Sequence, residues 1–210
     1  MKLHLVVGCV GAVALWSGAP CEARAGEPDD DARITITSMG LALGTSQLGP
    51  WRVFSEGLEL GHGLVWGRLR AQIDYQLGYA SAKHDSRDVD KRSGLAQRLG
   101  VSAMVNVVPL ARLSQSGIHL VASAGVQHAA LRDGIRVWRP DVGIGAIGAF
   151  TVPIEDSLVG VEMSVRFHVT PGPDDAAYDR LCLGACAESS SAPSVDLGFQ
   201  FVSRLVFGRP

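Results

Sequence analysis

Apolar and polar side chains alternate with a period of two along much of the chain. In the clearest segment, Arg68 to Tyr79, one parity is apolar from Leu69 onward, whereas the other carries arginine, glutamine and aspartate side chains. A β-strand points successive side chains to opposite faces, whereas a helix would mix the two sets around its surface. The segment is therefore predicted to be a strand with one apolar face and one polar face.

The same alternation recurs often enough to predict about eight strands. It is equally clear over residues 98–107, 159–169 and 195–207, and weaker over residues 118–126 and 142–152. Two N-terminal strands, within residues 34–43 and 58–66, are less regular. A change of parity between Ile36 and Met39 predicts a β-bulge near Ser38.

Tight turns and longer loops alternate as the connections between these segments. Residues 66–68, 113–117 and 153–157 are tight turns, whereas residues 83–94, 132–141 and 171–194 form longer polar loops, with a shorter one at 44–51. Bacterial outer-membrane barrels have short turns at one rim and longer loops at the other. The predicted fold is an all-β, closed antiparallel transmembrane barrel of about eight strands in up-and-down order, with both termini on the short-turn side.

Charge distinguishes this barrel from a soluble, lipocalin-like barrel, which would turn its apolar face inward. In the four clearest strands the apolar face carries no charged residue. The predicted ion network on the opposite face consists of Glu59, Arg68, Arg70, Asp74, Arg98, Glu162, Arg166, Asp196 and Arg204. Five arginines against four carboxylates are close to balance, which a closed lumen requires because an unpaired buried charge is strongly destabilising.

The N-terminus has the pattern of a secretory signal. Lys2 precedes an apolar run that extends to Trp16, and Ala23 and Ala25 supply small residues before a cleavage site. We predict a cleaved signal peptide over residues 1–25, a short periplasmic segment over 26–31 and an outer-membrane barrel domain over 32–210. No later stretch of 18 apolar residues suggests a helical membrane span.

The remaining composition narrows the chemistry. A formal net charge of −2 with no basic stripe argues against nucleic-acid binding, and the scattered histidines have no metal-ligand spacing. No catalytic residue, cofactor or metal is predicted. Cys182 and Cys186 are predicted to form a disulfide in an exported loop, the alternative being metal or redox chemistry.

A family resemblance enters at the last strand, where Val195 to Phe207 alternates and ends on an aromatic residue. The chain resembles the small eight-stranded outer-membrane barrels that include the OmpA membrane domain, OmpX and OmpW. This resemblance implies a Gram-negative outer membrane, and as partners outer-membrane lipid, lipopolysaccharide, the barrel-assembly machinery and an extracellular ligand at the loops. Gly208 to Pro210 depart from the pattern, because family members usually end on the aromatic residue.

The expected function is a structural or surface-interaction role, without enzymatic activity. The first alternative is a narrow channel for small or hydrophobic molecules, as OmpW would imply. The second is a lipid A-modifying enzyme, which resembles this chain only through His168-Val169-Thr170, the nearest approach to a His-x-Ser motif. Threonine replaces the nucleophile there, and parity places His168 in the lumen, away from a lipid substrate.

Overall fold

The computed structural model describes residues 33–84, 91–110, 115–132, 136–173, 178, 181–182 and 194–209. Eight strands form a closed barrel, and each is 15 to 19 residues long. They are β1 (Arg33–Leu48), β2 (Trp51–Trp66), β3 (Leu69–His84), β4 (Lys91–Pro109), β5 (Gly117–Leu131), β6 (Arg136–Ile154), β7 (Ser157–Pro171) and β8 (Val195–Arg209). The predicted signal peptide, residues 26–31 and Cys186 lie outside the described residues.

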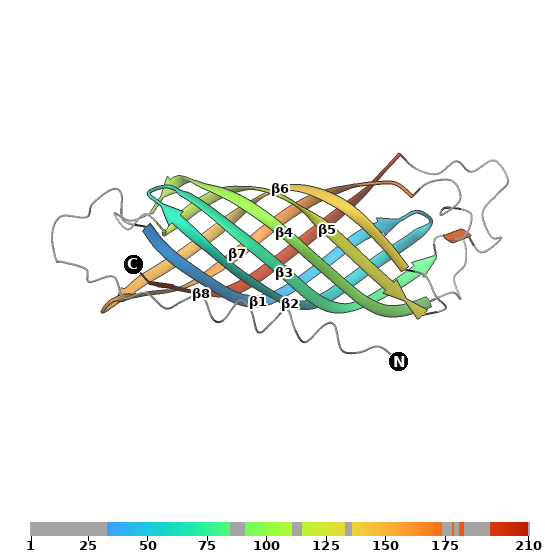
Figure 1. Ribbon diagram of the computed structural model, residues 1–210, viewed down its shortest axis with the longest axis horizontal. Coiled ribbons are helices and arrows are strands. Elements are labelled where there is room, and N and C mark those ends of the chain that lie inside the picture. Colours follow the sequence, from blue (N-terminus) through green and yellow to red (C-terminus); the bar gives the residue numbers. More distant parts are fainter. Residues whose placement is uncertain are drawn as a thin grey trace.

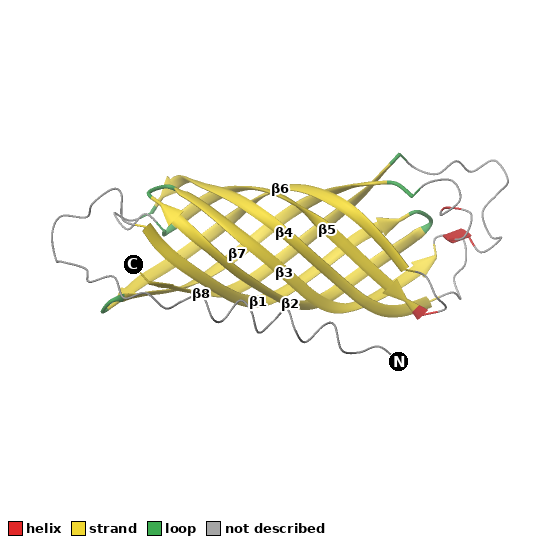
Figure 2. Cartoon of the chain, viewed as in Figure 1, coloured by secondary structure: helices red, strands yellow, loops and turns green. Residues whose placement is uncertain are grey.

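Every strand pairs antiparallel with its neighbour in the chain, and β8 closes the barrel on β1. This up-and-down order is the predicted fold class, which is confirmed. Figure 1 shows that β1 starts and β8 ends at one end of the barrel, and Figure 2 shows strands forming its whole wall. We call this the turn end and the opposite one the loop end. No described helix has the length and apolarity that crossing a membrane would take.

The strands extend further toward the loop end than the alternation predicted. β1 and β2 are joined by two residues, 49–50, where a loop over residues 44–51 was expected. β6 already begins at Arg136, within the predicted loop 132–141. Both expectations were wrong because the outer face becomes polar near this rim, so that strand residues there resemble a loop.

The predicted bulge at Ser38 was also wrong. β1 pairs with both β2 and β8 without a register shift, and the one shift between strands lies in the β4–β5 pair, between Asn106 and Val108. Ile36 instead faces the lumen, where it packs with Val65 and Val206. The alternation of inward and outward positions in β1 is therefore unbroken. Ile36 is apolar although it faces inward, because apolar side chains fill the turn end of the lumen.

Glycines allow the close approach of strands that a small barrel needs. Gly57 and Gly78 face each other across β2 and β3. A Cβ on Gly57 would lie 2.3 Å from the carbonyl oxygen of Leu77, and one on Gly78 would lie 2.2 Å from that of Glu56. Larger residues at either position would push the two strands apart.

Candidate functional site

The outer face of the barrel wall is apolar and the inner face is polar, which is the reverse of the arrangement in a soluble barrel. Large apolar side chains cover the outside, and Leu41, Ile73 and Ile144 are 63%, 58% and 70% exposed. The inner face carries the charged side chains. The site therefore consists of the lumen, where charge is concentrated away from solvent.

The lumen holds equal numbers of buried positive and negative side chains among the described residues. The five arginines are Arg70, Arg98, Arg139, Arg166 and Arg204, and the five carboxylates are Glu59, Asp74, Asp141, Glu162 and Asp196. Eight of the nine residues predicted for this network are in these two sets. The ninth, Arg68, was wrongly assigned: it is exposed in the turn between β2 and β3, because β3 begins one residue later.

Arg139 and Asp141 are the two lumen charges that the sequence did not reveal. They share the parity of Gly143 on β6 and point inward. They were assigned to a loop because Trp138 and Pro140 interrupt the apolar face beside them. The glycines further along β6 lie at the same parity, and this alternation was the signal in the sequence that could have placed both charges in the lumen.

Arg204 is the centre of the largest group of charges. Its Nε donates to Oε2 of Glu162 at 2.7 Å, and its Nη1 donates to Oε1 of Glu59 at 3.0 Å. The same Nη1 lies 3.6 Å from Oδ1 of Asp74. One side chain from β8 thus contacts carboxylates on β2, β3 and β7.

Two further arginines complete this group, which we call the central cluster (Glu59, Arg70, Asp74, Glu162, Arg166 and Arg204). Arg70 donates to Glu162 at 2.5 Å, and Arg166 donates to Glu59 at 3.2 Å. Asp74 also accepts hydrogen bonds from Gln72 and Ser102. Three positive and three negative groups, all buried, offset one another's desolvation, as buried charges require.

A second group lies nearer the loop end. Asp141 accepts a hydrogen bond from Nε of Arg98 at 3.0 Å and lies 3.0 Å from Nδ1 of His168. Nε2 of His168 lies 3.3 Å from Oε1 of Gln200, whose amide donates to Gln76. This chain of polar contacts joins β3, β4, β6, β7 and β8.

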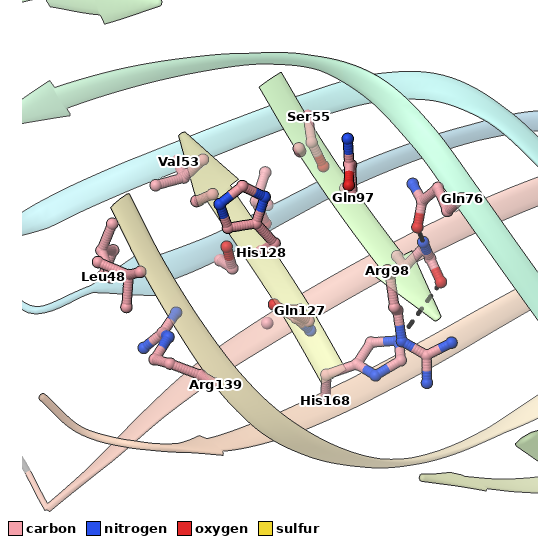
Figure 3. Close-up of a pocket in the computed structure, with 18 of the residues that line it drawn as sticks. Leu48, Val53, Ser55, Gln76, Gln97, Arg98, Gln127, His128, Arg139 and His168 are labelled. Atoms are coloured by element: carbon pink, nitrogen blue, oxygen red, sulfur yellow. Dashed lines mark hydrogen bonds between the residues drawn. The ribbon is translucent and has the colours of Figure 1, made fainter. Parts of the chain in front are cut away.

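A chamber of about 80 Å³ separates this second group from the loop end. Figure 3 shows Gln76, Arg98 and His168 on one side of it, and Leu48 and Val53 on another. Its wall is therefore polar toward the central cluster and apolar toward the loop end. Such a space can hold a few hydrogen-bonded water molecules.

The loop end is closed by an apolar cap (Leu48, Trp51, Val53, Ala80, Ala82, Leu131 and Leu181). Trp51 is fully buried, and its Nε1 donates to the carbonyl oxygen of Leu181 at 2.8 Å. Beside the cap, Arg139 of β6 pairs with Asp196 of β8. A residue of the β7–β8 connection thus lies over the barrel mouth.

The turn end is closed by the connection between β4 and β5. Gln115 and Ser116 are buried, and the Ser116 hydroxyl lies 3.0 Å from the hydroxyl of Thr151 on β6. Above them, Met104, Val121 and Ile147 form an apolar group inside the barrel. Side chains therefore occupy the lumen at both ends as well as at the central cluster.

The residues weighed for other chemistry have structural contacts. His168 and Thr170 both point into the lumen, and the Thr170 hydroxyl donates to the carbonyl oxygen of Asp196. No group of three histidine, cysteine or carboxylate side chains in the described residues could hold a metal ion. Cys182 is buried, and the predicted disulfide stays a prediction because Cys186 lies outside the described residues.

Comparisons with known proteins find similarity of shape. No protein-family model matches the chain. No curated protein matches it either. The structure is similar to that of Neisserial surface protein A (NspA), with a TM-score of 0.49 and 10% identity over 84% of this chain and 98% of that chain. It is also similar to Ail, the attachment invasion locus protein of Yersinia pestis, in complex with the heparin analogue sucrose octasulfate, with a TM-score of 0.44 and 13% identity over 83% and 98% of the two chains.

Proposed function

We propose that this chain is an outer-membrane barrel with a structural or surface-interaction role, and that its lumen does not conduct. The observation that carries the proposal is the central cluster, which links opposite walls of the barrel through buried ion pairs. A lumen spanned in this way supports the wall and leaves the connections at the loop end as the surface for interactions.

The outer face supports the membrane location. Exposed apolar side chains continue around the barrel on every strand, among them Leu58 on β2, Leu99 on β4 and Phe167 on β7. An exposed apolar patch of this extent would cause a soluble protein to aggregate. Closed β-barrels are one of the two structures that satisfy every backbone hydrogen bond within lipid.

The contacts of Arg204 argue against an open channel. Arg204 is 2% exposed, and its guanidinium contacts carboxylates on three strands. An eight-stranded barrel has an interior just wide enough for side chains to fill. Ions could pass only if several of these buried pairs separated together, and each separation would leave an uncompensated charge.

Fractionation tests the membrane location. The protein is expected to appear with outer membranes and to migrate differently in detergent gels before and after boiling, because a folded barrel resists the detergent. A periplasmic, water-soluble protein without heat-modifiable migration would contradict the proposal.

Planar-bilayer recording tests the closed lumen. The purified protein is expected to give no discrete openings, while a large porin measured in the same bilayers serves as the positive control. A variant with Glu162→Ser and Arg204→Ser removes one carboxylate and one arginine from the central cluster. Its conductance in the same bilayers tests whether the cluster blocks the passage of ions. Discrete openings of the unmodified protein would favour the channel alternative.

A further inference from the structure

A polar pair of side chains interrupts the apolar outer face of the barrel on β1 and β2, which lie side by side in the wall (Figure 1). Thr37 and His62 are cross-strand neighbours at outward-facing positions. The Thr37 hydroxyl oxygen lies 3.1 Å from Nδ1 of His62. Thr37 is exposed and His62 is partly exposed, so that both lie on the surface that faces lipid in the proposed membrane location. We call them the Thr37–His62 pair.

The pair lies well inside the apolar part of the outer face. On β2 the outward-facing side chains between Glu56 and Trp66 are leucines except for His62. The neighbour of His62 on β3 is Ile73, which is apolar and 58% exposed. His62 is four residues from Trp66, which corresponds to about 10 Å along the barrel axis at the usual rise and tilt of such strands. Since the apolar band of an outer-membrane barrel is about 25 Å tall, the histidine ring lies near its middle.

Within one barrel the pair leaves part of its hydrogen-bonding capacity unused. In a neutral histidine one ring nitrogen donates and the other accepts. Nδ1 is bound to Thr37, and no other described residue forms a hydrogen bond with Nε2. The Thr37 hydroxyl can also take part in a second hydrogen bond. A polar group in hydrocarbon is destabilising unless it has a partner, and ionisable residues inside membranes almost always face one. The position of His62 therefore requires a polar partner in the plane of the membrane.

The unused groups of the pair are complementary to those of a second, identical pair. If Nδ1 of His62 accepts from Thr37, then Nε2 carries the hydrogen and can donate to the Thr37 hydroxyl of another copy. In the other tautomer Nε2 accepts, and the Thr37 hydroxyl of the other copy donates. A two-fold axis makes both contacts reciprocal, because each copy presents the same surface to the other. A second copy thus supplies the matching donor and acceptor by symmetry, whichever tautomer is present.

Strand tilt confines the contact between two such barrels to a small area. Two copies that insert into the membrane in the same direction are related by a two-fold axis along the membrane normal. Strands that tilt by about 40° in each barrel then cross at about 80° where the two walls meet. Crossed walls touch near the axis and diverge away from it. Because lipid replaces apolar contacts at little cost, one reciprocal set of hydrogen bonds at the axis decides whether the copies associate.

We propose that two copies of this chain associate in the membrane through their β1–β2 walls, with the Thr37–His62 pairs in reciprocal hydrogen bonds at the two-fold axis. Leu60 and Leu64, two residues to either side of His62 on the same face of β2, pack around the axis. This inference rests on the proposed outer-membrane location, since it requires lipid around both barrels.

Energy transfer between separately labelled copies in lipid vesicles measures the association as the protein-to-lipid ratio rises. The unmodified protein is expected to give a signal that saturates. His62→Leu is expected to weaken the apparent association by about tenfold or more, because both reciprocal hydrogen bonds are lost. His62→Gln keeps a donor and an acceptor and should retain most of the association. Equal association of His62→Leu and the unmodified protein, or no energy transfer by the unmodified protein, would overturn the proposal.

Two controls separate an interface from a role within one barrel. His128 of β5, a histidine outside the β1–β2 wall, stacks on Trp138, and His128→Leu should associate as the unmodified protein does. At a low protein-to-lipid ratio, where the copies are separate, His62→Leu should resist urea at least as well as the unmodified protein, because leucine is the better residue in contact with lipid. A loss of stability under those conditions would show that the Thr37–His62 pair joins β1 to β2 instead, and would overturn the proposal.

Cysteine cross-linking locates the contact. Leu64→Cys places a thiol beside the axis, and a short thiol-reactive cross-linker should join it to the same residue of the second copy. Ile144→Cys on β6 is the matched control and should give no cross-linked dimer, although Ile144 is 70% exposed. The unmodified protein, which keeps Cys182 and Cys186, gives the background. A dimer that forms through Ile144→Cys and not through Leu64→Cys would overturn the assignment to the β1–β2 wall.

The outcomes separate this inference from the proposed function. A protein that does not insert into vesicles as a heat-modifiable barrel would overturn the membrane location, and the inference with it. Insertion without association would overturn the inference alone. Heat-modifiable migration of each variant shows that it is folded before its association is compared.

Discussion

The outer and inner faces of the same strands have environments that reverse the usual relation between burial and polarity. On β6, Ile144 is 70% exposed, whereas Asp141, three residues earlier, is 2% exposed and bound to an arginine. In a soluble barrel the isoleucine would be inside. In the proposed membrane location the isoleucine contacts lipid and the aspartate is shielded from it.

The two faces of the barrel wall are stabilised by different interactions. In the proposed membrane location the outer face gains little from contact between its own side chains, because lipid chains are as apolar as they are. The inner face depends on specific partners, since each buried charge needs an opposite charge and hydrogen bonds at defined positions. The effect of a substitution on stability should therefore depend first on the face of the barrel that it occupies and only then on the type of residue.

Removing the centre of the inner network should destabilise the barrel more than any other single substitution considered below. Arg204→Met should lower the free energy of unfolding by roughly 3–5 kcal/mol, because Glu59 and Glu162 would lose their shared partner and stay buried. The measurement is urea-induced unfolding of the protein in lipid vesicles. Arg209→Met on the same strand is the control, since Arg209 is exposed at the end of β8.

A control as destabilised as Arg204→Met would show that arginine at either position matters for some other reason. A neutral Arg204→Met would mean that the central cluster contributes no more than an apolar lumen would. Either result would remove the contrast between the two faces that the ion pairs suggest.

Placing charge on the outer face is the reciprocal change. Val161 is 47% exposed on β7, between Phe150 of β6 and Leu205 of β8. Val161→Arg should cost roughly 2–4 kcal/mol of folding free energy if the position is near the bilayer midplane. Unfolding in vesicles measures it, with Val161→Leu as the apolar control.

The cost of Val161→Arg should depend on lipid. It should fall in thinner bilayers, where a long side chain reaches the headgroups more easily. A cost that is equal in detergent micelles and in thick bilayers would argue that Val161 contacts protein rather than lipid.

The comparison of faces also explains what the sequence could predict. Alternation was clear where the outer face of the barrel is apolar, as along Leu69 to Tyr79, because such a face places an apolar residue at every second position. It failed near the loop end, where the outer face leaves the apolar region and Arg136 and Trp138 replace aliphatic residues. Arg139 and Asp141 were therefore missed, although they are strand residues.

Two other features had no local signal. The hydrogen bond from Trp51 to Leu181 joins residues 130 positions apart, so neither segment indicates the other. Ile36 is apolar yet faces the lumen, because the turn end of the interior is filled by side chains from β1, β2 and β8. Parity alone could place charge in the lumen but could not say where the lumen becomes apolar.

The two faces should also differ, by a smaller amount, in their tolerance of a larger side chain. Ile144 and Ile147 both lie on β6, but Ile147 is 1% exposed and packs on Met104 and Val121. Ile147→Phe should cost roughly 1–3 kcal/mol, because a filled interior cannot accommodate the larger ring without displacing its neighbours. Ile144→Phe should change stability by less than about 0.5 kcal/mol, since fluid lipid yields to the added volume. Unfolding of both variants in the same vesicles gives the difference directly, and equal costs would mean that Ile144 is packed against another protein surface.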